Sequence, residues 1–164
     1  MIMTPKRLLA FTVALWISIL AVDHDRFREK ANSIIQAEFC QASFKGDISA
    51  MKLWLAFGAK PNNMTLNWAA SSRNPDALRL LLDHGADVNS TIKFGTTPLH
   101  SAAGSGYAEN VRLLLQSGAN INARDDIGTP LDCALENHQT EVVYILKQAG
   151  AKAEREIVFT EFTF

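Results

Sequence analysis

The sequence contains only two cysteines, Cys40 and Cys133, among its 164 residues. They match neither the paired spacing of a zinc site nor a CxxC redox motif, and two cysteines cannot build a disulfide framework. The sequence therefore gives no reason to expect a metal centre or a stapled fold. An apolar core must hold the chain together.

An excess of charge of one sign is also missing, because the formal net charge is −1. Without Lys6 and Arg7, 14 of the 16 basic residues remain against 17 acidic ones, a balance of −3. Nucleic-acid-binding surfaces are typically strongly basic, so the charge balance argues against a nucleic acid partner. With 48% hydrophobic and 20% charged residues, the composition is that of one globular domain.

Long uncharged apolar runs are absent except for residues 8–22, which follow Lys6 and Arg7. As a helix, this run spans about 22 Å, less than the roughly 30 Å of a bilayer core. We predict that residues 1–22 are a signal peptide or a short membrane anchor. The expected location is periplasmic or secreted after cleavage, or alternatively anchored in the inner membrane with the rest outside the cytoplasm.

A unit of about 33 residues recurs along the remaining chain. Gly-Ala pairs follow leucine-rich runs, and 33 positions separate Gly85 from Gly118 while 32 separate Gly118 from Gly150. The tetrapeptide at 97–100, Thr-Pro-Leu-His, recurs as Thr-Pro-Leu-Asp at 129–132 and as a degraded copy at 64–67. Repetition at a fixed spacing indicates a repeat architecture.

Each unit carries the signals of two short helices. Thr97 suits an N-cap, and Pro98 suits the first helical position, where no amide hydrogen is needed. Leucines at 113–115 supply the apolar face of a second helix, which Gly118 can end in a left-handed conformation. The unit is predicted to be a helix-turn-helix with a projecting loop, here called a finger.

This pattern resembles the ankyrin repeat, with its period of about 33 residues and its T-P-L-H-x-A motif, in an exported bacterial type. The resemblance covers residues 38–153 and implies an all-α solenoid of about four repeats, at 38–62, 63–94, 95–126 and 127–153. An amphipathic capping helix is expected at 23–37, with Ile34, Ile35 and Phe39 among its apolar contacts. Residues 154–164 form a tail that we expect to fold back over the last helices.

Two departures from the repeat pattern carry predictions. Six residues are missing between Ala59 and Met64, so we expect a tight bend at Pro61 in place of a finger. Arg73 and His138 occupy the turn positions that hold glycine in repeats 1 and 3. Those two turns should be strained or differently shaped.

The polar residues inside the repeats are predicted to be structural. The resemblance implies that His100 ties adjacent repeats together by hydrogen bonds. Cys133 and His138 lie five positions apart with no third group to orient a base, so Cys133 is expected to be a buried thiol. Cys40 lies three repeats from Cys133, about 30 Å away, too far for a disulfide. No catalytic residue, cofactor or metal is predicted.

If the buried polar residues only stabilise the fold, the resemblance implies that a partner binds in the groove beside the inner helices and at the finger tips. Phe44, Trp68 and Phe94 are the expected anchors, since exposed aromatics among polar residues are typical of interface hot spots. Trp68 alternatively fills the space left by the missing finger. The pair Asp125 and Asp126 is expected to be solvated. The full set of predicted partner-binding residues is Phe44, Lys45, Trp68, Ser71, Ser72, Ile92, Lys93, Phe94, Ser105, Arg124, Asp125, Asp126, Glu136 and Asn137.

The sequence thus predicts a non-catalytic module of the cell envelope that binds another protein, as an inhibitor, an immunity protein or an escort. Two alternatives stay open. One is an accessory subunit or enzyme in which the repeats scaffold a site made by His100, Asp132 and Cys133. The other is a structural protein attached to the membrane through residues 8–22.

Overall fold

The computed structural model describes residues 25–153, so the predicted signal or anchor segment (1–22) and the tail (154–164) lie outside the described residues. Within that range the chain is helical and contains no strand. The helices are α2 (Asp25–Lys45), α3 (Ile48–Ala56), α4 (Asn63–Ala70), α5 (Pro75–Asp83), α6 (Pro98–Ser105), α7 (Ala108–Gln116), α8 (Pro130–Glu136) and α9 (Thr140–Gln148), with a short 3-10 turn, η1 (Lys93–Gly95).

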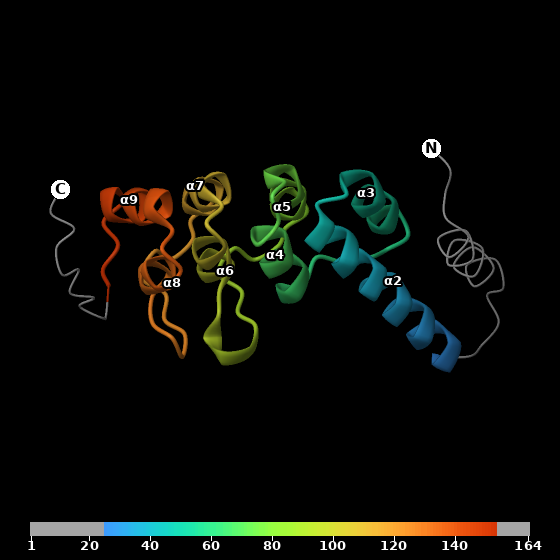
Figure 1. The fold of residues 1–164 in the computed structure, drawn as a ribbon. Coiled ribbons are helices and arrows are strands. Elements are labelled where there is room, and N and C mark those ends of the chain that lie inside the picture. Colours follow the sequence, from blue (N-terminus) through green and yellow to red (C-terminus); the bar gives the residue numbers. More distant parts are fainter. Residues whose placement is uncertain (1–24, 154–164) are drawn as a thin grey trace, which may run out of the picture.

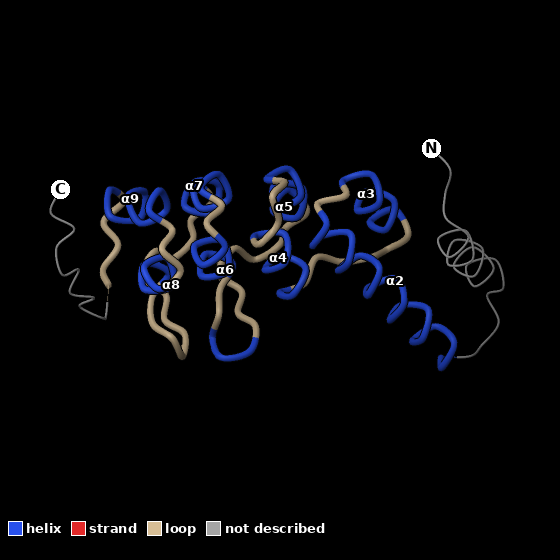
Figure 2. The backbone as a smooth tube through the Cα atoms, viewed as in Figure 1, coloured by secondary structure: helices blue, strands red, loops and turns tan. Residues whose placement is uncertain are grey.

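The helices stack in two rows (Figure 1). The inner row holds α2, α4, α6 and α8, the outer row holds α3, α5, α7 and α9, and neighbours within each row are in contact. Two fingers, residues 86–97 and 119–129, project beyond the inner row below α6 and α8 (Figure 2). The predicted all-α solenoid is confirmed for the described residues.

One continuous core runs between the two rows. Small residues of the inner helices, such as Ala69, Ala102 and Ala134, are fully buried and allow adjacent helices to approach closely. Leucines of the outer helices, including Leu78, Leu81 and Leu114, are fully buried between neighbouring pairs. Each helix pair thus completes the core of the next, which is the energetic basis of a stacked array.

The predicted helix signals at Thr97 and Pro98 are confirmed, since Thr97 is the N-cap of α6 and Pro98 is its first residue. Glycine ends the outer helices as expected, with a φ of 87° at Gly118. His138, at the turn position of repeat 4, is held at a φ of 57°. The left-handed region costs a residue with a Cβ atom about 1–2 kcal/mol, so the predicted strain of that turn is present.

The degraded second repeat has a helix cap that differs from the Thr-Pro start of α6. Helix α4 is capped by Asn62, whose side-chain oxygen accepts from the Thr65 amide at 2.8 Å, and the Thr65 hydroxyl oxygen accepts from the Asn62 amide at 2.8 Å. This reciprocal capping box starts α4 at Asn63. Arg73, in the turn that follows, is not in the left-handed region.

The N-terminal boundary also differs. Helix α2 runs without a break to Lys45, so the expected capping helix at 23–37 and the first helix of repeat 1 are one element. Phe39 is fully buried and Ile35 packs against the core, as expected, whereas Ile34 is 48% exposed and was wrongly assigned to the apolar contacts.

The missing finger is confirmed between α3 and α4 (Figure 2). After Gly58, the chain crosses directly to Asn63, with Ala59 buried and Pro61 half-buried. The side-chain amide of Gln36 donates to the Lys60 carbonyl at 3.0 Å and fixes this short crossing to α2.

Candidate functional site

His100 is a buried link between two repeats, as predicted. Its Nε2 lies 3.1 Å from the carbonyl oxygen of Gly128 in the next repeat. Because that oxygen can only accept, Nε2 carries the hydrogen and Nδ1 of the neutral ring is the acceptor. Nδ1 accepts from the amide and the hydroxyl of Thr97, at 3.2 and 2.8 Å. Both ring nitrogens therefore stabilise the scaffold.

Asp125 was expected to be solvated, and this was wrong. Its side chain is only 2% exposed. One carboxylate oxygen accepts from the amides of Ile127 and Gly128 at 2.8 and 3.0 Å, and the other accepts from the Thr96 hydroxyl at 3.1 Å. Its neighbour Asp126 is exposed, as expected. Asp125 therefore shapes the second finger and joins it to the first, because short acidic side chains readily bond nearby backbone amides in turns.

Asparagines that recur at one position of the repeats add further cross-links, which the sequence analysis missed. The oxygen of Asn89 accepts from the Asn120 amide at 2.7 Å, and its nitrogen donates to the Gly118 carbonyl at 3.2 Å. One repeat later, Asn122 accepts from the Lys152 amide at 2.8 Å. The sequence carries a signal for these cross-links, since each asparagine stands four positions after the glycine that ends the outer helix of its own repeat.

Phe94 lies at the tip of the first finger, with 72% of its surface exposed. Its backbone is left-handed, with φ 65° and ψ 16°. The second finger holds it in place, because the Asp126 amide donates to the Phe94 carbonyl at 3.1 Å. A phenylalanine here combines backbone strain with an apolar ring that gains little burial, and such strained residues concentrate at functional sites.

Phe44 and Trp68 form a second aromatic group on neighbouring inner helices. Their ring centroids are 5.5 Å apart at an interplanar angle of 69°, an edge-to-face contact. Phe44 is 56% exposed and Trp68 is 38% exposed, so the contact leaves part of each ring accessible. Met64, one turn before Trp68, is 49% exposed and extends the group. Met64 is not among the site residues predicted from the sequence.

The other predicted site residues divide by exposure. Ser72 is wrong as a contact residue, because it is 3% exposed and its hydroxyl donates to the Asn74 carbonyl at 3.2 Å. Ser71 and Ile92 are half-buried. The exposed members are Lys45, Lys93, Ser105, Arg124, Asp126, Glu136 and Asn137.

Asn110 is a structural residue that the sequence analysis missed. It is 1% exposed, and its side-chain nitrogen donates to the carbonyls of Ala70 and Ser72, each at 2.8 Å. These carbonyls lie at the end of α4, where no intrahelical amide remains to bond them. Asn110 in α7 thus replaces the glycine cap that Arg73 cannot provide.

The residues suggested for an enzyme are buried in the scaffold. His100, Asp132 and Cys133 are 2%, 0% and 7% exposed. The Asp132 carboxylate accepts from the amide and the hydroxyl of Thr129 at 2.8 and 2.7 Å, which caps α8. Cys40 and Cys133 are both buried thiols outside any disulfide, as predicted. Burial raises the pKa of the Cys40 thiol, although a hydrogen bond with Gln36 opposes this.

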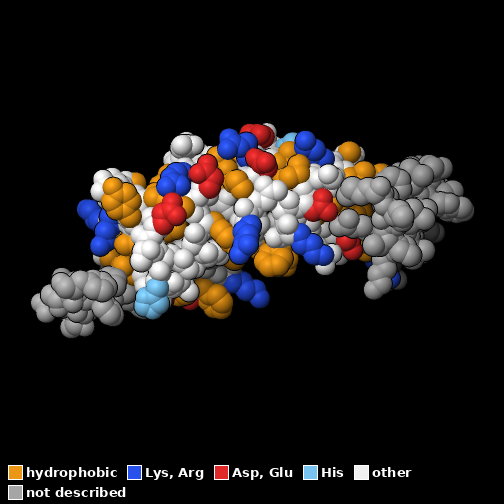
Figure 3. Space-filling model, turned by 45° about the horizontal axis from the view of Figure 1, so that its top comes forward, with side chains coloured by type: hydrophobic (Ala, Val, Ile, Leu, Met, Phe, Trp, Pro, Cys, Tyr) orange, Lys and Arg blue, Asp and Glu red, His pale blue; other side chains and the backbone are white. Residues whose placement is uncertain are grey.

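The outer helices present a different surface, in which Lys and Arg are interspersed with Asp and Glu (Figure 3). Arg112 on α7 bonds Glu141 on α9 at 3.1 Å and lies 3.6 Å from Glu109. Such exposed pairs contribute little, about 0–1 kcal/mol each. Tyr144 on α9 is 66% exposed. Across residues 25–153, no helix combines the length and apolar composition needed to span a bilayer.

Comparison with known proteins agrees with the geometry. A family model described as ankyrin repeats (3 copies) matches residues 39–125, which is more than half of the chain. No curated protein matches the chain. The matched region covers the inner aromatic group, the first finger and residues 119–125 of the second.

Proposed function

Because this chain belongs to the ankyrin repeat family, we propose that its finger tips and inner helices bind a partner protein. Ankyrin repeats indicate a protein-protein interaction module, and the family is typically a non-catalytic scaffold. The proposal assigns binding to side chains that the scaffold leaves exposed. The buried polar groups have the separate role of joining the repeats.

The observation that carries the proposal is Phe94. A finger tip needs no aromatic for its own stability, and the left-handed conformation disfavours any residue other than glycine, asparagine or aspartate. The backbone bond from Asp126 fixes the tip in advance, so a partner would meet an ordered ring. Rigid aromatic anchors bind with a small loss of conformational entropy, which is the property of interface hot spots.

The surroundings of Phe94 support a protein partner. Lys93, Arg124 and Asp126 are exposed on the same two fingers, which gives an apolar centre with a charged rim. Phe44 and Trp68 supply a second apolar contact on the inner row. A partner that engages both groups would lie across the fingers and along the inner helices.

We place this module in the cell envelope, on the strength of the apolar run at 8–22 behind Lys6 and Arg7. An exported protein-binding module suits the role of an inhibitor, an immunity protein or an escort. Amino-terminal sequencing of the protein from periplasmic and membrane fractions tests this placement. A mature chain that starts near residue 22 supports cleavage, and a retained run in the membrane fraction supports the anchor.

No observation favours the enzyme alternative, since His100, Asp132 and Cys133 are buried in the scaffold. The structural alternative, a protein attached to the membrane through residues 8–22, shares the anchor but requires no partner. The partner experiment therefore separates it from the proposed function.

The experiment captures partners from periplasm on the immobilised chain, with Phe94→Ala as the test variant. Tyr144→Ala removes an equally exposed aromatic from the outer face and is the matched control. We expect one stoichiometric protein to bind the wild type and Tyr144→Ala, with affinity reduced at least tenfold in Phe94→Ala, as for a hot spot above about 1.4 kcal/mol. If Phe94→Ala binds as tightly as the wild type, or if only Tyr144→Ala loses affinity, the binding site does not include Phe94.

A further inference from the structure

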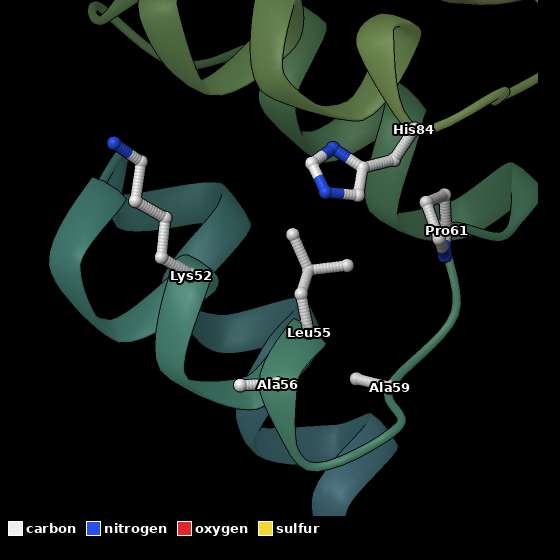
Figure 4. A pocket seen from close by; sticks show the side chains of 6 residues that line it. All are labelled: Lys52, Leu55, Ala56, Ala59, Pro61 and His84. Atoms are coloured by element: carbon white, nitrogen blue, oxygen red, sulfur yellow. The ribbon is translucent and has the colours of Figure 1, made fainter.

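The missing finger leaves a hollow between α3 and α5 (Figure 4). Its volume is about 510 Å³. The lining residues come from α3, from the short crossing that replaces the finger and from the end of α5: Lys52, Leu55, Ala56, Ala59, Pro61 and His84. The hollow is open to solvent and lies away from the finger tips.

The sequence explains why the hollow forms at this place. Pro61 stands three positions after Gly58, where Val88 and Ile121 stand after their own glycines. Val88 and Ile121 both pack against the core of the stack, at the points where the fingers descend. At the crossing, the next residue, Asn62, caps α4 and does not continue into a finger. The hollow is thus the space that a finger would cover.

The floor of the hollow is apolar, and its rim carries nitrogen groups. Figure 4 shows the side chains of Lys52 and His84 on either side of Leu55. Nδ1 of His84 donates to the Leu80 carbonyl at 2.8 Å, because a carbonyl can only accept. Neither Nε2 of His84 nor the Lys52 ammonium has a bonding partner among the described residues. The site therefore offers an apolar surface beside the Lys52 ammonium, which has no ion-pair partner within residues 25–153.

We propose that this hollow receives an aliphatic side chain with a carboxylate beside it, presented by the partner protein. The aliphatic group would lie on Leu55 and Pro61, and the carboxylate would pair with Lys52. Sites for small molecules usually bury 70–90% of the ligand, so an open hollow holds a free small molecule only weakly. A side chain that is part of a docked protein brings its own cover, so the geometry favours a protein as the source. This inference rests on the proposed function and extends the contact surface from the inner helices to the outer helices of repeats 1 and 2.

The test is a titration of the 15N-labelled chain with N-acetylleucine, which joins an aliphatic side chain to a carboxylate. N-acetylleucine amide lacks the charge, and N-acetylglycine lacks the side chain. We expect amide shifts confined to residues 52–61 and to the neighbourhood of His84. The amide probe should bind about three- to fivefold more weakly, the usual scale of an exposed ion pair. N-acetylglycine should bind more weakly by a further several-fold, because the apolar contact is lost.

Two variants localise the effect. Lys52→Gln should reduce the affinity for N-acetylleucine about threefold and leave that for the amide probe unchanged. Lys147→Gln, an exposed lysine on α9, is the matched control and should change neither. Equal affinity for the acid and its amide would overturn the proposal, as would shifts scattered over Phe44 or Phe94. These results do not depend on Phe94, so failure here is distinguishable from failure of the proposed function.

Discussion

Replacing Phe94 by glycine and by alanine tests whether the finger tip stores strain for binding. At φ 65°, a residue with a Cβ atom loses about 1–2 kcal/mol relative to glycine. Glycine also has greater conformational freedom in the unfolded chain, which offsets about 0.4–1 kcal/mol of its advantage in the folded state. Both variants lose the same ring, so the difference between them isolates the backbone term. Phe94→Gly should exceed Phe94→Ala in free energy of unfolding by on the order of 1 kcal/mol.

The assay is urea unfolding followed by circular dichroism, with thermal unfolding as a second readout, where this difference corresponds to roughly 2–4 °C. Lys93 is the matched control, because it is exposed on the same tip and its φ is not positive. There the order should reverse, with Lys93→Ala more stable than Lys93→Gly. If Phe94→Ala equals or exceeds Phe94→Gly, the tip is not held in a left-handed conformation and the argument from strain fails.

Three further predictions concern the scaffold. Asn110→Ala leaves two buried carbonyls without donors and should lower the free energy of unfolding by about 1–3 kcal/mol in urea titration; a loss below 0.5 kcal/mol would show that water replaces the amide. Gly46→Ala should lower the free energy of unfolding more than Gly58→Ala in the same assay. Both glycines are left-handed, but only at Gly46 would the new Cβ contact Asn74, at 2.7 Å. Equal losses would refute this. Burial raises the pKa of the Cys40 thiol above its ordinary value of 9.0. The stability that this thiol contributes is therefore complete below pH 9.0 and is lost as the pH rises toward the raised pKa of the folded state. Between pH 8 and pH 10 the wild type should lose more free energy of unfolding than Cys40→Ala, and equal losses would contradict this.

Much of the scaffold could be predicted because local chemistry determines it. The Thr-Pro starts of α6 and α8 and the glycine ends of α5, α7 and α9 depend on a few neighbouring residues. The absent finger follows from counting positions between Gly58 and Gly85. Prediction failed at the N-terminal boundary, because nothing in residues 37–38 interrupts α2.

The site was less predictable, because exposure depends on contacts between repeats. Phe94 follows from the sequence, since a finger tip has few neighbours to cover it. Asp125 does not, because its burial comes from the backbone of its own finger and from Thr96 of the other one. Asn110 shows the same limit, because the carbonyls that it bonds lie about 40 positions earlier, at the end of α4, and no spacing in the chain indicates them.

Hydrogen-deuterium exchange of the chain with its captured partner tests the central claim most directly. The account predicts slower exchange at residues 92–97 and 124–128 of the two fingers when the partner is bound, with the exposed outer surface of α7 and α9 unchanged. Protection confined to α7 and α9, with both finger tips exchanging as in the free chain, would contradict it.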